Sequence, residues 1–227
     1  MKTILLSNIF ILTLSVLTSC TLLQGKADPS QEYIAGNSNE LAVSVSEVEE
    51  ALTQYESMGA GTYRVRATIL TPALLELREK SKPYDKKIIE QNLIQAKKDF
   101  ADNKTCFHIT LKVINQAKYA YFDEWKGRVF VENNNQKLEF PLEWTTESLN
   151  NKPKALSASA FYGKTDHYFN EGIACTETPF PLKNGFTLKL LPSYIQWPFD
   201  GTLDLSWSFV DPNNKTPKKI KERYRGW

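Results

Sequence analysis

The stretch Cys106-Phe107-His108-Ile109-Thr110-Leu111-Lys112-Val113 decides the fold class. Every second residue from Phe107 to Val113 is large and apolar, and the residues between them are mostly polar. Strict alternation of this kind predicts a β-strand with one buried face and one face toward solvent. We therefore expect a domain built mainly on antiparallel strands over a shared hydrophobic core.

A second segment, residues 62–70, repeats this alternation. Its apolar positions are Tyr63, Val65, Ala67 and Ile69, and its polar positions include Arg64, Arg66 and Thr68. The sequence therefore predicts another half-buried strand here.

Turn sequences predict three hairpins in the second half of the chain. Asn133-Asn134-Asn135 separates the strand-like segments 127–132 and 136–140. Asn184-Gly185 and Asp200-Gly201 suit tight hairpin turns, because Asn, Asp and Gly accept a left-handed backbone. The first of these turns would join a strand at 173–176 or 180–182 to 186–190. The second would join 194–197 to 203–210.

Two helices are also expected. The first runs from about Ser46 to Met58, with a capping pair Ser46 and Glu49 at its start and Gly59 and Gly61 at its end. The second runs from about Asp85 to Ala101, where one stripe is apolar and the opposite face is charged. That stripe consists of Ile89, Leu93, Ala96 and Phe100. Residues 72–82 fit either a short helix or a continued edge strand.

These elements predict an α+β fold. We expect seven or eight short strands in an antiparallel β-sandwich or partly open barrel, with one or two packed helices. The globular part is expected to span residues 44–212.

The N-terminus has the layout of a secretory leader. Lys2 precedes an apolar run, residues 4–17, which is too short for a stable membrane span. The run ends in Leu17-Thr18-Ser19-Cys20, which resembles the lipobox of bacterial lipoproteins. An ordinary signal peptide with an incidental cysteine is the alternative.

The lipobox resemblance implies a membrane anchor. It implies cleavage before Cys20, so that residues 1–19 are a signal peptide and Cys20 carries lipid. Two or more acyl chains hold a protein firmly in a bilayer. The polar residues 20–43 would then form a flexible tether. Thr21 is not the Asp that retains many lipoproteins in the inner membrane, so an outer-membrane location in the cell envelope is expected.

Cys106 and Cys175 are the cysteines that remain once Cys20 carries lipid. In an oxidising envelope compartment such a pair predicts a disulfide. Together with His108 and His167 they could alternatively supply four ligands to a zinc ion. Their spacing matches no known zinc motif, and we expect no metal and no cofactor.

Catalytic motifs are missing from the sequence. A Ser–His–Asp relay would have to come from Ser157 or Ser159 with Asp166 and His167. One histidine among many hydroxyls and carboxylates does not define such a relay.

Aromatic residues offer a candidate binding surface for a sugar or peptide. Trp125, Trp144 and His167 are its principal residues, and the alternative is that the tryptophans belong to the core. The basic tail, residues 213–227, could contact anionic lipid or an acidic partner, or could be a solvated terminus.

We therefore predict a lipid-anchored envelope protein that binds or scaffolds an envelope protein or a glycan and performs no chemistry. An envelope enzyme or enzyme inhibitor, and a surface-exposed adhesin, are the alternatives. Nucleic acid is not an expected partner, because the protein leaves the cytoplasm.

Overall fold

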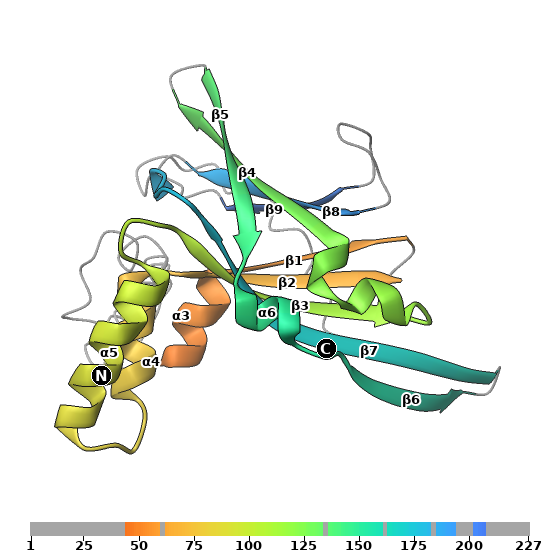
Figure 1. The fold of residues 1–227 in the computed structure, drawn as a ribbon, viewed down its shortest axis with the longest axis horizontal. Coiled ribbons are helices and arrows are strands. Elements are labelled where there is room, and N and C mark those ends of the chain that lie inside the picture. Colours follow the sequence, from red (N-terminus) through yellow and green to blue (C-terminus); the bar gives the residue numbers. More distant parts are fainter. Residues whose placement is uncertain are drawn as a thin grey trace, which may run out of the picture.

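The computed structural model describes residues 44–59, 62–133, 136–160, 163–182, 185–193 and 202–207. The predicted leader, Cys20, the predicted tether and the basic residues 213–227 lie outside these residues. The described part has the predicted α+β class: one antiparallel sheet curls into a nearly closed barrel, with short helices packed at its ends (Figure 1).

The described strands are β1 (Thr53–Met58), β2 (Tyr63–Leu70), β3 (Cys106–Ile114), β4 (Trp125–Asn133), β5 (Gln136–Trp144), β6 (Lys154–Ala160), β7 (Gly163–Thr176), β8 (Phe186–Pro192) and β9 (Leu203–Trp207). The helices are α3 (Val45–Ala51), α4 (Pro72–Lys80), α5 (Lys86–Phe100) and α6 (Thr146–Asn150), with 3₁₀ turns η2 (Ala117–Ala120) and η3 (Phe122–Glu124).

The order of strands around the barrel is β1-β2-β3-β7-β5-β4-β8-β9, and β6 pairs with the outer part of β7. The last strand, β9, returns to the neighbourhood of β1. There the indole N–H of Trp207 donates to the backbone carbonyl of Leu52 at 3.0 Å. This buried hydrogen bond joins the two edges of the sheet and brings the barrel close to closure.

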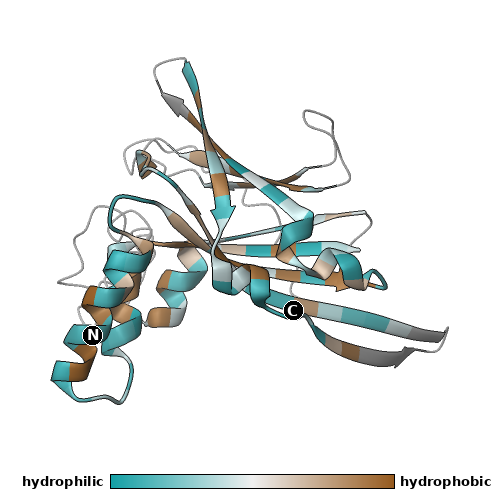
Figure 2. Ribbon diagram, viewed as in Figure 1, coloured by the Kyte–Doolittle hydropathy of each residue, from teal (hydrophilic) through white to brown (hydrophobic). Residues whose placement is uncertain are grey.

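The alternation in β2 and β3 holds in the structure. Ala67 pairs with Ile109, which pairs in turn with Gly172 of β7, so these positions share the inner face of the barrel. Figure 2 shows apolar and polar residues alternating along these strands. The inner face is fully or almost fully buried, and its large side chains include Ile69, Phe107, Ile109, Leu111, Leu188, Leu190, Leu203 and Leu205.

Gly172 leaves room for packing on this inner face. A Cβ atom at this position would lie 2.5 Å from Cε2 of Phe122 and 2.8 Å from Cβ of Ser148. Cβ atoms do not make contacts that short, so the missing side chain allows η3 and α6 to pack against β7.

The prediction of a helix over 46–58 is wrong in its second half. The helix α3 ends at Ala51, and Thr53–Met58 forms β1, which pairs with β2. The cap is Ser44 with Glu47, rather than Ser46 with Glu49. Gly59, at φ +63°, lies in the turn between β1 and β2 and does not end a helix. Pairing with β2 thus overrides the helix expected over residues 53–58.

The ambiguous segment 72–82 contains a helix, α4, and the predicted second helix is α5. Thr71 caps α4, since its hydroxyl accepts from the backbone N–H of Leu74 at 3.2 Å. The predicted stripe of α5 does face the protein, but it is only half-buried, and no residue of α5 is fully buried. The helix packs mainly against α4 at the margin of the fold.

The hairpin over 127–140 is confirmed as β4 and β5. The predicted pairing of 186–190 with 173–176 or 180–182 is wrong, because β8 pairs with β4 and β9. Residues 194–201, including Asp200-Gly201, lie outside the described residues. Strand order depends on contacts between distant segments, which a turn dipeptide does not encode.

The predicted disulfide between Cys106 and Cys175 is confirmed. The two residues are direct partners in the ladder of β3 and β7, and their sulfur atoms are 2.05 Å apart. They face outward from the barrel, next to Leu70 of β2, on the side where the chain continues into α4 and α5. The bond ties two central strands together across 69 residues of sequence.

Replacement of both cysteines by alanine is expected to lower the free energy of unfolding by about 2–4 kcal/mol, because the unfolded chain regains the freedom that the loop closure removes. Urea unfolding of the native protein with and without reductant measures the change. The double variant is the control, since reductant should not affect it. Equal midpoints for oxidised and reduced native protein would contradict the prediction.

Candidate functional site

Trp125 lies in the core and does not offer a surface to a ligand. Its side chain is only 2% exposed, and its indole N–H donates to the carbonyl of Tyr119 at 2.8 Å. Its ring meets the ring of Tyr63 edge to face, at 5.7 Å between centroids.

Trp144 and His167 do not join Trp125 in one exposed platform. The indole N–H of Trp144 donates to the carbonyl of Trp125 at 2.9 Å. The ring of Trp144 packs on the ring of Phe122, with 4.4 Å between the ring centroids. His167 is half-exposed and pairs with Ile114 of β3. Trp144 pairs with Ala174, seven residues further along β7, which places His167 about 23 Å away. The two tryptophans thus have structural roles, and His167 stands apart from them.

The zinc alternative lacks its ligands. Both cysteine sulfurs are bonded to each other, so no thiolate is left for a metal. His108 and His167 lie at positions of β3 and β7 that are about 20 Å apart along the ladder.

The Ser–His–Asp alternative is not assembled either. Asp166 and His167 are neighbours in β7, so their side chains point to opposite faces of the sheet. Ser157 pairs with Asp166 in the ladder between β6 and β7, and Ser159 lies further along β6. His167 therefore does not stand between an acid and a nucleophile.

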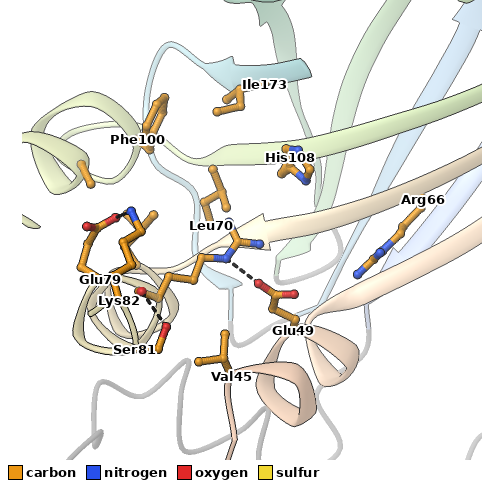
Figure 3. A pocket seen from close by; sticks show the side chains of 13 residues that line it. Val45, Glu49, Arg66, Leu70, Glu79, Ser81, Lys82, Phe100, His108 and Ile173 are labelled. Carbon is orange, nitrogen blue, oxygen red and sulfur yellow. Dashed lines mark hydrogen bonds and ion pairs between the residues drawn. The ribbon is translucent and has the colours of Figure 1, made fainter. Parts of the chain in front are cut away.

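A cleft with charged and apolar walls lies between the helices and the outer face of the sheet (Figure 3). Its volume is about 600 Å³, within the range of pockets that hold small molecules. Helices α3, α4 and α5 supply one side, and β2, β3 and β7 supply the other. The strand register explains which residues form the sheet side of the cleft. Arg66 and Leu70 of β2, His108 of β3 and Ile173 of β7 all lie on the outer face.

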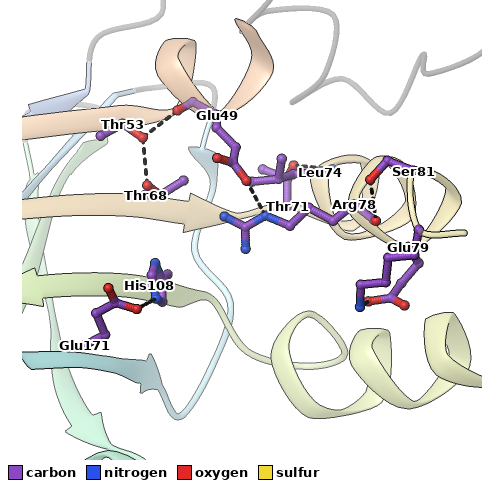
Figure 4. A network of polar contacts seen from close by, with 11 residues as sticks. Glu49, Thr53, Thr68, Thr71, Leu74, Arg78, Glu79, Ser81, His108 and Glu171 are labelled. Atoms are coloured by element: carbon purple, nitrogen blue, oxygen red, sulfur yellow. Dashed lines mark hydrogen bonds and ion pairs between the residues drawn. The ribbon is translucent and has the colours of Figure 1, made fainter. Parts of the chain in front are cut away.

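Two ion pairs border the cleft (Figure 4). The Nε of Arg78 donates to Glu49 at 2.6 Å, and this pair joins α4 to α3. The ammonium of Lys82 meets one carboxylate oxygen of Glu79 at 2.5 Å. The other carboxylate oxygen of Glu79 is buried and has no hydrogen-bond partner in the described structure. Glu49 and Glu79 are therefore each balanced by a cation.

Arg66 is the cation in the cleft that no carboxylate balances. Among the described residues none places a carboxylate within ion-pair distance of it, and its guanidinium lies over the ring of Tyr55 at 5.9 Å. With Glu49 and Glu79 paired, Arg66 gives the lining an excess of one positive charge.

His108 is held toward its neutral form. Burial, and then the nearby guanidinium of Arg78, lower the pKa of His108, while Glu171 offsets only part of this effect. Arg66 also lowers this pKa and Glu49 raises it. The Nε2 of His108 is 3.9 Å from Glu171, too far for a hydrogen bond. Both arginines thus act on one imidazole from the same side of the sheet.

The remaining wall of the cleft is apolar. Leu70 and Leu75 are buried, Phe100 and Ile173 are half-buried, and Figure 3 shows Leu70, Phe100 and Ile173 together on one side of the cleft. Val45 and Ala96 are further apolar residues that line the cleft. One hydroxyl, that of Ser81, lines the described cleft, and it donates to the carbonyl of Arg78 at 2.8 Å.

Sequence reasoning did not find this cleft. Arg66 occupied an ordinary solvent-facing position of an alternating strand, and residues 72–82 had no assigned structure. Among the residues that line the cleft, only His108 was named as a candidate site residue, and it was named as a possible zinc ligand. The residues come from six separate elements, so no local spacing links them.

Comparison with protein-family models finds no match for this chain, and comparisons with curated proteins and with solved structures find none. Within the described ranges, no helix has the length and apolar character needed to cross a membrane.

The lowered pKa of His108 predicts a pH-dependent stability. Because the unfolded chain takes up this proton more readily than the folded chain, the free energy of unfolding should fall as the pH drops from about 7 to about 5. Replacement of His108 by Gln should make this fall smaller. Urea unfolding at several pH values measures it, with His167→Gln as the control for replacing a histidine. An unchanged pH dependence in His108→Gln would contradict the prediction.

Proposed function

We propose that this chain is a lipoprotein of the bacterial cell envelope whose folded domain binds a ligand or partner without chemistry. Acyl chains on Cys20 would hold it in the membrane, with the outer membrane favoured by Thr21. Residues 20–43 would link the anchor to the domain, which begins at α3.

The Cys106–Cys175 disulfide supports the envelope location. Disulfides persist in oxidising compartments and are rare in the reducing cytosol. The bond joins two central strands and is therefore part of the fold rather than a surface accessory. This agrees with a leader that directs the chain out of the cytoplasm.

The cleft between the helices and the outer face of the sheet carries the binding part of the proposal. It combines an apolar wall with a few polar groups, which is the usual composition of a ligand site. Arg66 and the terminal amino groups of Arg78 provide donors there, and the Nε of Arg78 is already held by Glu49. The ion pair keeps the guanidinium of Arg78 in place without a ligand.

The chemistry of the same cleft favours binding over catalysis. An enzyme would gain support from a histidine within hydrogen-bond reach of a carboxylate, and the His108–Glu171 distance of 3.9 Å exceeds that reach. The cleft hydroxyl, on Ser81, donates to a backbone carbonyl rather than to His108. No base and nucleophile are therefore paired among the described lining residues.

Replacement of Cys20 by Ala is expected to release the protein from the membrane fraction, because the thioether-linked chains would be missing. Fractionation of cells followed by immunoblotting measures this, and mass spectrometry of the native N-terminal peptide should show the lipid. Cys106→Ala is the matched control for loss of a cysteine and should leave membrane retention unchanged. Retention of the Cys20→Ala protein in the membrane after its leader, residues 1–19, has been removed would contradict the proposed anchor.

A further inference from the structure

We infer that the cleft between α3, α4, α5 and the outer face of β2, β3 and β7 binds an amphipathic anion. Arg66 and Arg78 hold its carboxylate or phosphate group, and its apolar chain lies along Leu70, Phe100 and Ile173. This inference rests on the proposed function, because it names the class of ligand for the same cleft.

The net charge of the residues that line the cleft favours a ligand with one anionic group. Glu49 is paired with Arg78 at 2.6 Å and Glu79 with Lys82 at 2.5 Å, so these four charges cancel in pairs. Arg66 is left as the excess cation. His108, the remaining ionisable group of the lining, is held toward its neutral form, and Glu171 near it points to solvent with 68% of its side chain exposed.

The guanidinium groups of Arg66 and Arg78 have N–H donors that an oxyanion can use. Arg78 uses its Nε for Glu49, and its terminal amino groups donate to no acceptor among the described residues. Among the described residues, Arg66 has the face of the Tyr55 ring as its partner. Planar guanidinium groups bind carboxylate and phosphate oxygens through paired N–H donors, and burial beside an apolar wall strengthens such bonds.

The cleft has an apolar wall in addition to these two arginines. Arg66 and Leu70 share the outer face of β2 and are separated by about 13 Å along the strand. Leu70 lies beside Phe100 and Ile173 in the cleft (Figure 3). A ligand that fills the cleft therefore needs a charged end and an apolar chain. A fully polar anion would leave the apolar wall unused.

The ligand class is tested by calorimetry on the mature chain, residues 20–227, carrying Cys20→Ala, which lacks only the proposed lipid. The probes are octanoate, octyl phosphate, 1-octanol and acetate, with octanoate and octyl phosphate kept below their micelle concentrations. We expect at least one of the two amphipathic anions to bind, and 1-octanol and acetate to bind at least about tenfold more weakly. The tighter of octanoate and octyl phosphate identifies the charged group.

Arg66→Gln should weaken binding of the preferred anion by about tenfold or more and leave binding of 1-octanol unchanged. The matched control is Arg64→Gln, an arginine on the same face of β2 that does not line the cleft, and it should keep the native affinity. Thermal unfolding of both variants confirms that they fold.

Three results would overturn the inference. These are equal affinity for 1-octanol and the anions, equal binding by Arg66→Gln and Arg64→Gln, and no binding of any probe. Membrane release of Cys20→Ala together with any of these would leave the envelope lipoprotein proposal standing and reject only the ligand class.

Discussion

The pairing of β3 with its two neighbours is the interaction on which the rest of the structure depends. β3 lies between β2 and β7, and its inner residues fill the centre of the barrel. The Cys106–Cys175 disulfide fixes the register between β3 and β7, because the two cysteines are direct partners in that ladder. Because side chains alternate along a strand, a slip of one residue would exchange the two faces. Phe107 and Ile109 would then leave the core, so burial and the disulfide enforce the same register.

This register also creates the cleft. With Phe107 and Ile109 inward, His108 must point outward, beside Ile173 of β7 and on the face of β2 that carries Arg66 and Leu70. The chain leaves β2 into α4 and α5, which pack over this end of the sheet, and the Arg78–Glu49 pair joins α4 to α3. The cleft lies between these layers. Its polar groups are thus a consequence of which residues the core leaves on the outer face.

The sequence predicted what depends on local pattern and missed what depends on distant pairing. Alternation was enough to identify β2 and β3 and their inner faces, and helical spacing located α5. The same spacing failed over residues 53–58, where pairing with β2 makes a strand. The aromatic side chain of Trp125 would suit either a surface or a core. Only the folded chain shows that its indole N–H is hydrogen-bonded within the core. The cleft draws on six elements and has no local motif, so Arg66 looked like any solvent-facing residue.

The most direct test of the account is to map ligand contacts on the protein by NMR, with assigned backbone amides and a titration of octanoate or octyl phosphate. We predict shifts concentrated in residues 45–49, 66–70, 78–82, 96–100 and 171–173, together with His108, and little change around Trp125 and Trp144. Shifts centred on the two tryptophans, or spread evenly over the barrel, would contradict the claim that the outer face of β2, β3 and β7 is the binding surface.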